Sequence, residues 1–198
     1  MELRPVLGST YVADGATALL PIYKLNSTDI VLLDTGYAKL DRSALTHLLD
    51  DNGFHLKGIL CSHAHFDHTG NVRYLQQRYG ALAAAQLIEA GISVNPDAYR
   101  ANYVALTYGR SRAYFLEECF TADVIIPADA TELTFCGAKF GILQLPGHSA
   151  GHIGIVTAVL FNHADSTVFR WMAGQRGHLQ HAALLQALVA LRAHHVVE

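Results

Sequence analysis

Short apolar runs alternate with polar turns along the first third of the chain. Two of these runs, 16–25 and 29–37, are bounded by Asp, Asn, Ser and Gly. A third run, 56–62, ends directly at a group of histidines. Apolar runs of this length between turn-forming residues are typical of buried β-strands, so we expect three strands here.

Two segments, 41–53 and 71–80, have the apolar spacing of amphipathic helices. The residues on the apolar faces are Leu45, Leu48 and Leu49 in the first segment and Val72, Leu75 and Tyr79 in the second. We expect Asp41 to cap the start of the first helix. Gly53 and Gly80 are expected to end the two helices.

The later part of the chain mixes strand and helix patterns. The segments are predicted strands at 132–147, 152–161 and 167–174 and a predicted amphipathic helix at 181–195. Segment 91–123 has many Tyr, Arg and small residues without a clean period, and we expect a helical excursion over a site. No repeat or linker interrupts the sequence, so a single domain is expected over 1–198.

Charge and hydropathy exclude two classes of partner. Charged residues make up 16% of the 198 residues and the formal net charge is −3, so no basic surface is expected to bind nucleic acid. No apolar run approaches the roughly 20 residues that span a bilayer, and the N-terminus lacks a basic stretch followed by an apolar core. We expect a cytoplasmic protein with no nucleic-acid or membrane partner, and a homo-oligomer stays an open alternative.

The three cysteines do not form a recognisable metal or disulfide motif. They lie at wide spacings without a Cys-x-x-Cys pair. We expect them to be small buried apolar residues. Cys61 has an alternative role in lining a site, because it lies two positions before His63.

The segment 62–71, SHAHFDHTGN, concentrates metal-ligand side chains. In an extended backbone alternate side chains point to the same side, so His63 and His65 are expected to converge on one cation. Asp67 and His68 follow within the next turn and are placed to face a second cation. Imidazole and carboxylate ligands suit zinc, iron or manganese, so the segment predicts one or two divalent metal ions. The spacing alone does not choose among these metals, and zinc is taken as the first candidate.

A second histidine motif, LPGHSAGH at 145–152, follows another apolar run. Its Pro-Gly turn is expected to present His148 at the same sheet edge as the first cluster. The two motifs together predict one metal site built from distant parts of the chain.

These motifs and their order resemble the metallo-β-lactamase superfamily. The similarity runs from about residue 20 to 157 and rests on LLDTG, H-x-H-x-D-H and LPGHSAGH. It implies an α/β fold, an αβ/βα four-layer sandwich of two mixed β-sheets flanked by helices. The implied ligands are His63, His65 and His148 for the first metal and Asp67 and His68 for the second. Asp34 resembles the family's supporting aspartate, with a turn-capping role as the alternative.

The resemblance implies a metal-dependent hydrolase. A divalent ion lowers the pKa of bound water from about 15.7 toward about 7, and the metal-bound hydroxide attacks an ester, lactone, thioester or amide carbonyl of a small-molecule substrate. Asp67 is the catalytic residue expected to orient that water or accept its proton. Three arginines in 99–115 are candidates to meet a substrate carboxylate, with a solvated helix face as the alternative: Arg100, Arg110 and Arg112.

Two ligands of the family pattern have no clear counterpart, a bridging Asp and a last His near the C-terminus. Residues 153–161 form one apolar run, which at about 3.3 Å per residue extends roughly 30 Å, so Asp165 is expected in a distant turn. Gln175 stands where the family has an aspartate, and whether it or Asp165 takes the bridging position stays open. The sandwich is therefore expected to be incomplete at its C-terminus.

A degenerate second site leads to an alternative function. A non-catalytic or truncated metal-binding member would hold one metal and hydrolyse nothing, and an iron-based redox member would be coloured. The remaining histidines of the C-terminal region are expected to be solvated: His163, His178, His181, His194 and His195.

Overall fold

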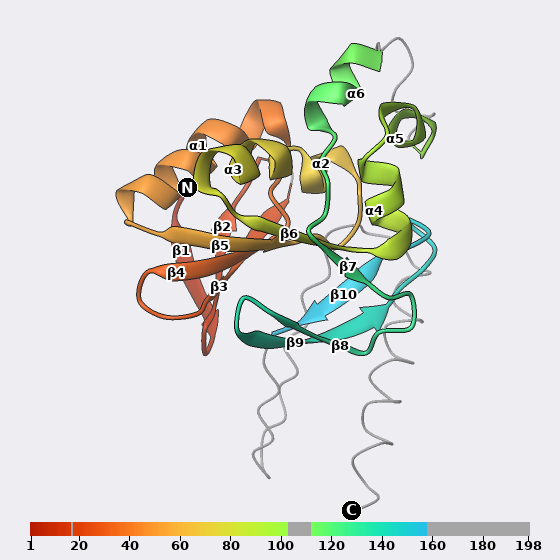
Figure 1. The fold of residues 1–198 in the computed structure, drawn as a ribbon. Helices are drawn as coiled ribbons and strands as arrows, with labels where there is room; N and C mark the ends of the chain where they lie inside the picture. The colour runs from red at the N-terminus through yellow and green to blue at the C-terminus, as the bar shows by residue number, and fades with distance from the viewer. Residues whose placement is uncertain (17, 103–111, 158–198) are drawn as a thin grey trace, which may run out of the picture.

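A computed structural model describes the chain over residues 1–16, 18–102 and 112–157 (Figure 1). The strands are β1 (Leu3–Leu7), β2 (Thr10–Asp14), β3 (Leu19–Lys24), β4 (Asp29–Leu33), β5 (His55–Leu60), β6 (Leu82–Gln86), β7 (Val124–Ile126), β8 (Glu132–Phe135), β9 (Ala138–Gln144) and β10 (Ile153–Val156). The helices are α1 (Ala38–Asp51), α2 (Phe66–Thr69), α3 (Val72–Tyr79), α4 (Leu87–Ser93), α5 (Pro96–Asn102) and α6 (Arg112–Glu118).

The strands form two sheets. In the seven-stranded sheet each strand pairs with its neighbour in sequence, in the order β1 to β7. Pairing is antiparallel from β1 to β4 and parallel from β4 to β7. The described residues of the second sheet form an antiparallel set in the order β10, β9, β8. Because parallel strands run the same way, the carboxyl ends of β4, β5 and β6 meet at one edge of the large sheet.

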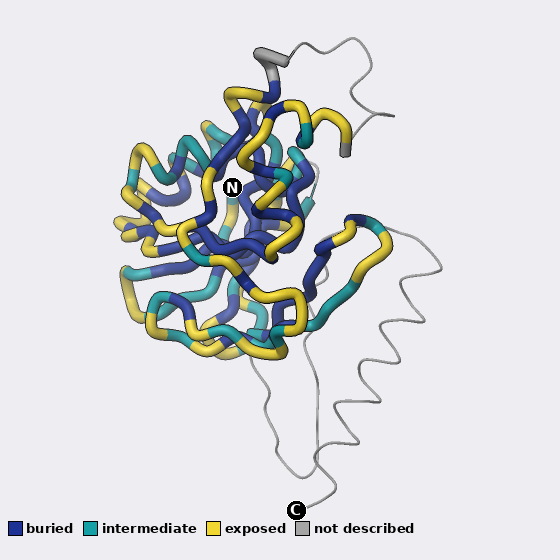
Figure 2. The backbone as a smooth tube through the Cα atoms, turned by 45° about the vertical axis from the view of Figure 1, so that its right-hand side comes forward, coloured by how far each residue is buried: buried dark blue, intermediate teal, exposed yellow. Residues whose placement is uncertain are grey.

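The large sheet is buried on both faces. In β4, Ile30 and Leu32 pack in the core that α1 and α3 cover, while Val31 and Leu33 pack in the core shared with β8, β9 and β10. This arrangement explains why β4 is a continuous apolar run instead of an alternating one. Figure 1 shows α1 and α3 on one side of the sheet and the small sheet on the other, and Figure 2 shows the buried segments at the centre.

The αβ/βα fold class predicted from the sequence is confirmed, with one difference of detail. The smaller sheet is antiparallel, not mixed, over the described residues. The strands predicted at 16–25, 29–37, 56–62, 132–147 and the first part of 152–161 correspond to β3, β4, β5, the β8–β9 hairpin and β10. The predicted strand at 167–174 and helix at 181–195 lie outside the described residues.

The first predicted helix is confirmed, but the expected N-cap is wrong. Helix α1 begins at Ala38, and Tyr37 takes the N-cap position. Asp41 lies inside the first turn, where its buried carboxylate accepts the backbone N–H of Tyr37 at 2.8 Å and that of Ala16 at 2.6 Å. The carboxylate therefore satisfies one donor at the helix start and one in the loop between β2 and β3. Gly53, with φ of +62°, follows the helix end as expected.

The second helix and the excursion also follow the sequence pattern. In α3, Val72 and Leu75 are buried, Tyr79 is partly buried, and Gly80 ends the helix in the left-handed conformation. Segment 91–123 contains the end of α4 together with α5 and α6, so its helical character is confirmed. None of the helices that the structure describes is long and apolar enough to cross a bilayer.

Four strands were not expected from the sequence: β1, β2, β6 and β7. Strand β6 has the sequence LAAAQ, and alanine has little preference for strands. Its three alanines are buried, because β6 lies in the centre of the parallel part of the sheet. The burial of the strand, not the propensity of its residues, determines its structure.

Candidate metal centre

Two strand ends, one short helix and one hairpin carry the side chains of the site. Asp34 directly follows β4, His63 is the third residue after β5, and α2 then carries Asp67 and His68. The β9–β10 hairpin carries His148 in its loop. A backbone hydrogen bond of 2.9 Å from Ile153 N–H to the Ser62 carbonyl joins this hairpin to the histidine segment.

The structure brings three of the predicted ligands together. One ring nitrogen from each of His63, His65 and His148 lies within 4.8 Å of the other two. The ring centroid of His65 lies 4.4 Å from that of His63 and 4.5 Å from that of His148. The ring centroids of His63 and His148 are 4.9 Å apart. Histidines from distant parts of the chain thus converge at one point.

The chemistry of this group fits a divalent metal. The Nε2 atoms of His63 and His148 are buried and have no hydrogen-bond partner among the described residues. A buried polar atom without a partner costs free energy of the order of 1–3 kcal/mol. A metal ion held by these nitrogens satisfies them, because neutral imidazole is a ligand of zinc and similar ions.

Asp67 and His68 lie beside the three histidines. The ring centroid of His68 is 4.2 Å from that of His63, and His68 Nε2 is 3.7 Å from Asp67 Oδ2. His68 is buried, whereas the Asp67 side chain keeps 28% of its surface exposed. The carboxylate of Asp67 therefore reaches the side of the site that solvent enters.

Asp34 contacts Ser62 and His68 of the site through its carboxylate. It is buried, and its carboxylate accepts the Ser62 N–H at 2.7 Å and the Ser62 hydroxyl at 2.6 Å. The same carboxylate lies 2.9 Å from His68 Nδ1. A carboxylate on Nδ1 fixes the orientation of the ring and leaves Nε2 to face the site. These contacts match the supporting role of Asp34 and not the turn-capping alternative.

Burial keeps most of the histidines uncharged. It lowers the pKa of His63 and His148 below the usual range and that of His65 to about 3, and charge on neighbouring rings adds to the effect. His68 differs: burial lowers its pKa, but the hydrogen bond and charge of Asp34 raise it above its ordinary value. The three histidines that converge are therefore neutral at pH 7, which is the form that binds a metal.

Two residues of the site were not singled out from the sequence, His152 and Glu89. His152 is buried and its ring centroid is 4.6 Å from that of His63. In the described part of the chain, neither ring nitrogen of His152 has a hydrogen-bond partner. Burial lowers the pKa of His152 to about 4. Glu89 is buried in the first turn of α4. The sequence pattern did not indicate it, because β6, the strand directly before α4, was not predicted. The signal for His152 was its place in the GHSAGH motif.

The helical excursion packs against the histidine segment. Tyr99 of α5 and Phe115 of α6 are fully buried and form a small core with Ala64. The Tyr99 hydroxyl lies 2.8 Å from Thr69 Oγ1, which donates to the His65 carbonyl at 3.0 Å. Arg100 is exposed at the end of α5, while Arg110 and the side chain of Arg112 lie outside the described part of the chain.

The remaining predicted residues are the cysteines and the C-terminal candidates. Cys61 is buried and burial raises its pKa, and Cys119 is also buried, whereas Cys136 is only half-buried. None of these three cysteines forms a disulfide with another described residue. The C-terminal candidates outside the described residues are Asp165, Gln175, His163, His178, His181, His194 and His195.

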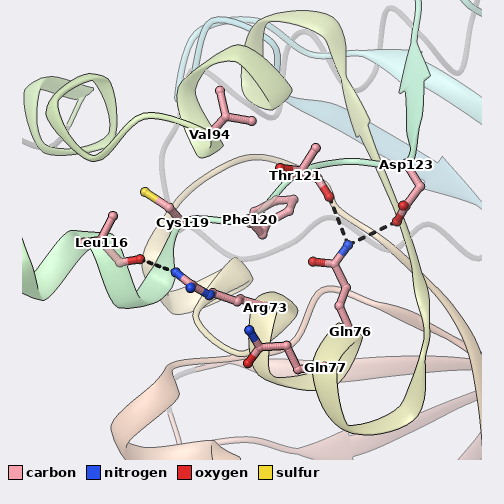
Figure 3. A pocket seen from close by; sticks show the side chains of 9 residues that line it. All are labelled: Arg73, Gln76, Gln77, Val94, Leu116, Cys119, Phe120, Thr121 and Asp123. Carbon is pink, nitrogen blue, oxygen red and sulfur yellow. Dashed lines mark hydrogen bonds between the residues drawn. The ribbon is translucent and has the colours of Figure 1, made fainter.

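An open pocket of about 410 Å³ lies elsewhere, on the helical side of the molecule (Figure 3). It is lined by Arg73, Gln76, Gln77, Val94, Leu116, Cys119, Phe120, Thr121 and Asp123. Figure 3 shows the Gln76 amide donating to the Thr121 carbonyl and the Asp123 carboxylate. None of the lining residues belongs to the candidate metal centre.

Sequence comparison relates the chain to a known family and to curated proteins. The sequence pattern of the metallo-beta-lactamase superfamily matches residues 22–159. A hydroxyacylglutathione hydrolase of Shewanella pealeana is 29% identical over 136 residues, which cover 68% of this chain and 41% of that protein. One of Shewanella baltica is also 29% identical, over 66% of this chain and 40% of that protein. The chain thus spans about two fifths of these curated relatives.

Solved structures show the same fold. The class B3 di-zinc metallo-beta-lactamase LRA-12 from an Alaskan soil metagenome has a TM-score of 0.68 at 18% identity, covering 95% of this chain and 74% of that chain. The FEZ-1 metallo-beta-lactamase of Legionella gormanii has a TM-score of 0.63 at 17% identity, covering 83% of this chain and 60% of that chain. At such identities the likeness establishes the fold.

Proposed function

The chain belongs to the metallo-β-lactamase superfamily, and on that premise we propose that it is a metal-dependent hydrolase of a small molecule. The reaction proposed is attack of activated water on an ester, lactone, thioester or amide carbonyl. One observation carries the proposal: the neutral rings of His63, His65 and His148 converge, with His63 and His65 buried and His148 half-buried.

The proposed ligands are the five side chains that meet at the strand ends. His63, His65 and His148 would hold a first ion, and Asp67 with His68 a second. The bound ion, for which zinc is our first candidate, would lower the pKa of water and polarise the carbonyl. Asp34 holds His68 through Nδ1, so that Nε2 is directed into the site.

Asp67 is the proposed catalytic residue. Its carboxylate is partly exposed, so it is accessible to water and to a substrate. A carboxylate in this place can orient the attacking water or accept its proton. His68, whose Nε2 is 3.7 Å from Asp67 Oδ2, lies where it would keep that carboxylate in position.

The substrate class is proposed from the relatives. Those in the two Shewanella species carry the name hydroxyacylglutathione hydrolase, which puts an acylated glutathione first among the substrates to assay. We also propose a cytoplasmic location without a nucleic-acid or membrane partner. The wide spacing of the three cysteines, without a Cys-x-x-Cys pair, suits a reducing compartment, and the net charge of −3 does not suit nucleic acid.

The test measures metal content and hydrolysis on the same preparation. Protein purified without added metal is analysed by plasma mass spectrometry and then assayed on acylated glutathione, lactones and simple esters. We expect bound zinc, iron or manganese and hydrolysis that Asp67→Asn reduces at least 100-fold. His47→Ala, in an exposed histidine of α1, is the control and should change neither quantity. Two equivalents of metal without hydrolysis of any member of the series would contradict the proposal.

A second candidate is a one-metal binding protein without hydrolase activity. The observation that favours it concerns residues 1–16, 18–102 and 112–157. Among these, His63, His65 and His148 form a group of three ligand side chains, whereas Asp67 and His68 are not joined by a third side chain that would complete a second group. This candidate predicts one equivalent of metal and no turnover. The same preparation thus distinguishes the two functions.

A further inference from the structure

Glu89 is a buried carboxylate that the proposed reaction does not use. It lies in the first turn of α4, directly after β6, where the Gln86 side chain caps the helix by accepting the Ile88 N–H at 2.6 Å. Only 1% of Glu89 is exposed. A charged group is buried in this way only when hydrogen bonds or opposite charges compensate for the loss of water.

One oxygen of Glu89 is bonded to the first histidine segment. Oε2 accepts the backbone N–H of Ala64 at 2.7 Å. Ala64 separates His63 from His65, so this bond holds the peptide unit between the two ligands. The bond therefore constrains the extended backbone that sends both rings to the same side.

The other oxygen is bonded to the second histidine segment. Oε1 accepts the backbone N–H of Gly151 at 2.7 Å and also the hydroxyl of Ser149. Ser149 follows His148 directly, and Gly151 precedes His152. A single carboxylate thus connects two ligand segments that come from different sheets and lie far apart in the sequence.

Close packing at Gly151 makes this connection possible. A Cβ atom at Gly151 would lie 2.2 Å from Gln86 Oε1 and 3.0 Å from Glu89 Cγ. Only glycine lets the hairpin backbone approach the start of α4 this closely. The Glu89 bond and the Gly151 contact therefore belong to one tightly fitted junction.

We propose that Glu89 is a positioning residue of the metal centre, which fixes the separation between the His63–His65 pair and His148. The inference rests on the metal site of the proposed function but not on hydrolysis. Glu89 accepts hydrogen bonds with both oxygens and stands outside the group of converging ligand atoms, so it acts through the ligand backbones. Asp34 follows β4 and Glu89 follows β6, the two strands that neighbour β5, so the two carboxylates lie on either side of the end of β5.

Glu89→Gln tests this role with little change of shape. Both carboxylate oxygens face donors, so the amide must place its own N–H group against that of Ala64 or that of Gly151. We expect the affinity for Zn²⁺, measured by competition with a chromophoric chelator, to fall about 10- to 100-fold. The visible spectrum of the Co²⁺-loaded protein should change as well, because its bands report the ligand geometry. Glu117→Gln, in an exposed glutamate of α6, is the matched control and should match the wild type.

The outcomes separate this inference from the proposed function. A folded Glu89→Gln variant with wild-type Zn²⁺ affinity and Co²⁺ spectrum would overturn the positioning role alone. A wild-type protein that binds neither ion would overturn the metal centre and this inference with it. If Glu89→Gln does not fold, Ser149→Ala replaces it, since this change removes one donor and leaves Glu89 bonded to two backbone groups. A severalfold loss of Zn²⁺ affinity then supports the role, and an unchanged affinity overturns it.

Discussion

Asp34 Oδ2 lies 2.9 Å from Nδ1 of His68, and both side chains are almost fully buried. Nε2 of the same ring lies 3.7 Å from Asp67. The imidazole is therefore held between a supporting carboxylate and the carboxylate proposed to act on water. Asp34 itself has φ of +67°, a conformation that non-glycine residues adopt at a cost of the order of 1–3 kcal/mol. Three hydrogen bonds to its carboxylate help the chain to sustain that backbone.

Asp34→Asn should weaken the second metal position more than the first. The amide keeps the shape of the side chain but removes the negative charge that holds His68. We expect the affinity for a second equivalent of Zn²⁺ to fall about 10- to 100-fold, with the first changed less. Calorimetric titration of the metal-free protein resolves the two steps. An equal loss at both positions would contradict the assignment of Asp34 to His68.

His63→Ala should remove metal and the stability that metal supplies. The ring of His63 lies within 5 Å of the rings of His65, His68, His148 and His152, measured between centroids. We expect metal content to fall below a tenth of an equivalent, and the rise of melting temperature on Zn²⁺ addition to disappear. Differential scanning calorimetry measures the melting temperature of the metal-free and of the Zn²⁺-loaded protein. His47→Ala serves as the control, and a retained metal content would refute the ligand role.

The metal-free protein should lose stability as the pH falls from about 6.5 toward 4. Burial lowers the pKa of four histidines in the folded state, and the unfolded chain binds protons at these residues first: His63, His65, His148 and His152. His68 has a raised pKa and acts in the opposite direction, but it is one group against four. Urea unfolding at several pH values in the presence of a chelator measures how the free energy of unfolding changes with pH. A free energy of unfolding that stays constant between pH 6.5 and 4 would contradict this prediction.

Gly151→Ala should be destabilising although alanine is small. The new Cβ would lie 2.2 Å from Gln86 Oε1, so either the Gln86 side chain must leave its bond to the Ile88 N–H or the hairpin must move. We expect a loss of about 1–3 kcal/mol in the free energy of unfolding, as for other overpacked sites. Gly91→Ala is the matched control, because nothing lies within 4 Å of its added Cβ. Denaturant titration of both variants gives the comparison, and equal stabilities would argue against a close junction.

The sequence was informative where the chemistry is local. The alternation in His63-Ala64-His65 and the turn that follows predicted which side chains converge, and the structure places them together with His148. The apolar runs before Asp34 and His63 predicted β4 and β5 because strands buried on both faces are apolar throughout.

The remaining parts of the site depend on contacts between distant residues. Glu89 bonds to Gly151 across 62 positions, and nothing in the neighbourhood of Glu89 indicates that partner. The strand before it, β6, is rich in alanine, so its place between β5 and β7 comes from these two neighbours and not from its own residues. The role of Asp41 was also not predictable from its neighbours in the sequence, because its partner Ala16 lies 25 positions away.

The order of strands in the large sheet has a kinetic consequence. Each strand from β2 to β7 pairs with the strand just before it in the chain, so the sheet can grow by successive local steps. Sheets built from such pairings fold faster than those that need distant pairings. His63 and His65 then acquire their geometry early, and His148 reaches them only when the β9–β10 hairpin docks. During refolding a Zn²⁺ binding signal should therefore appear only when the β9–β10 hairpin docks, after pulsed hydrogen exchange shows protection of β4 and β5.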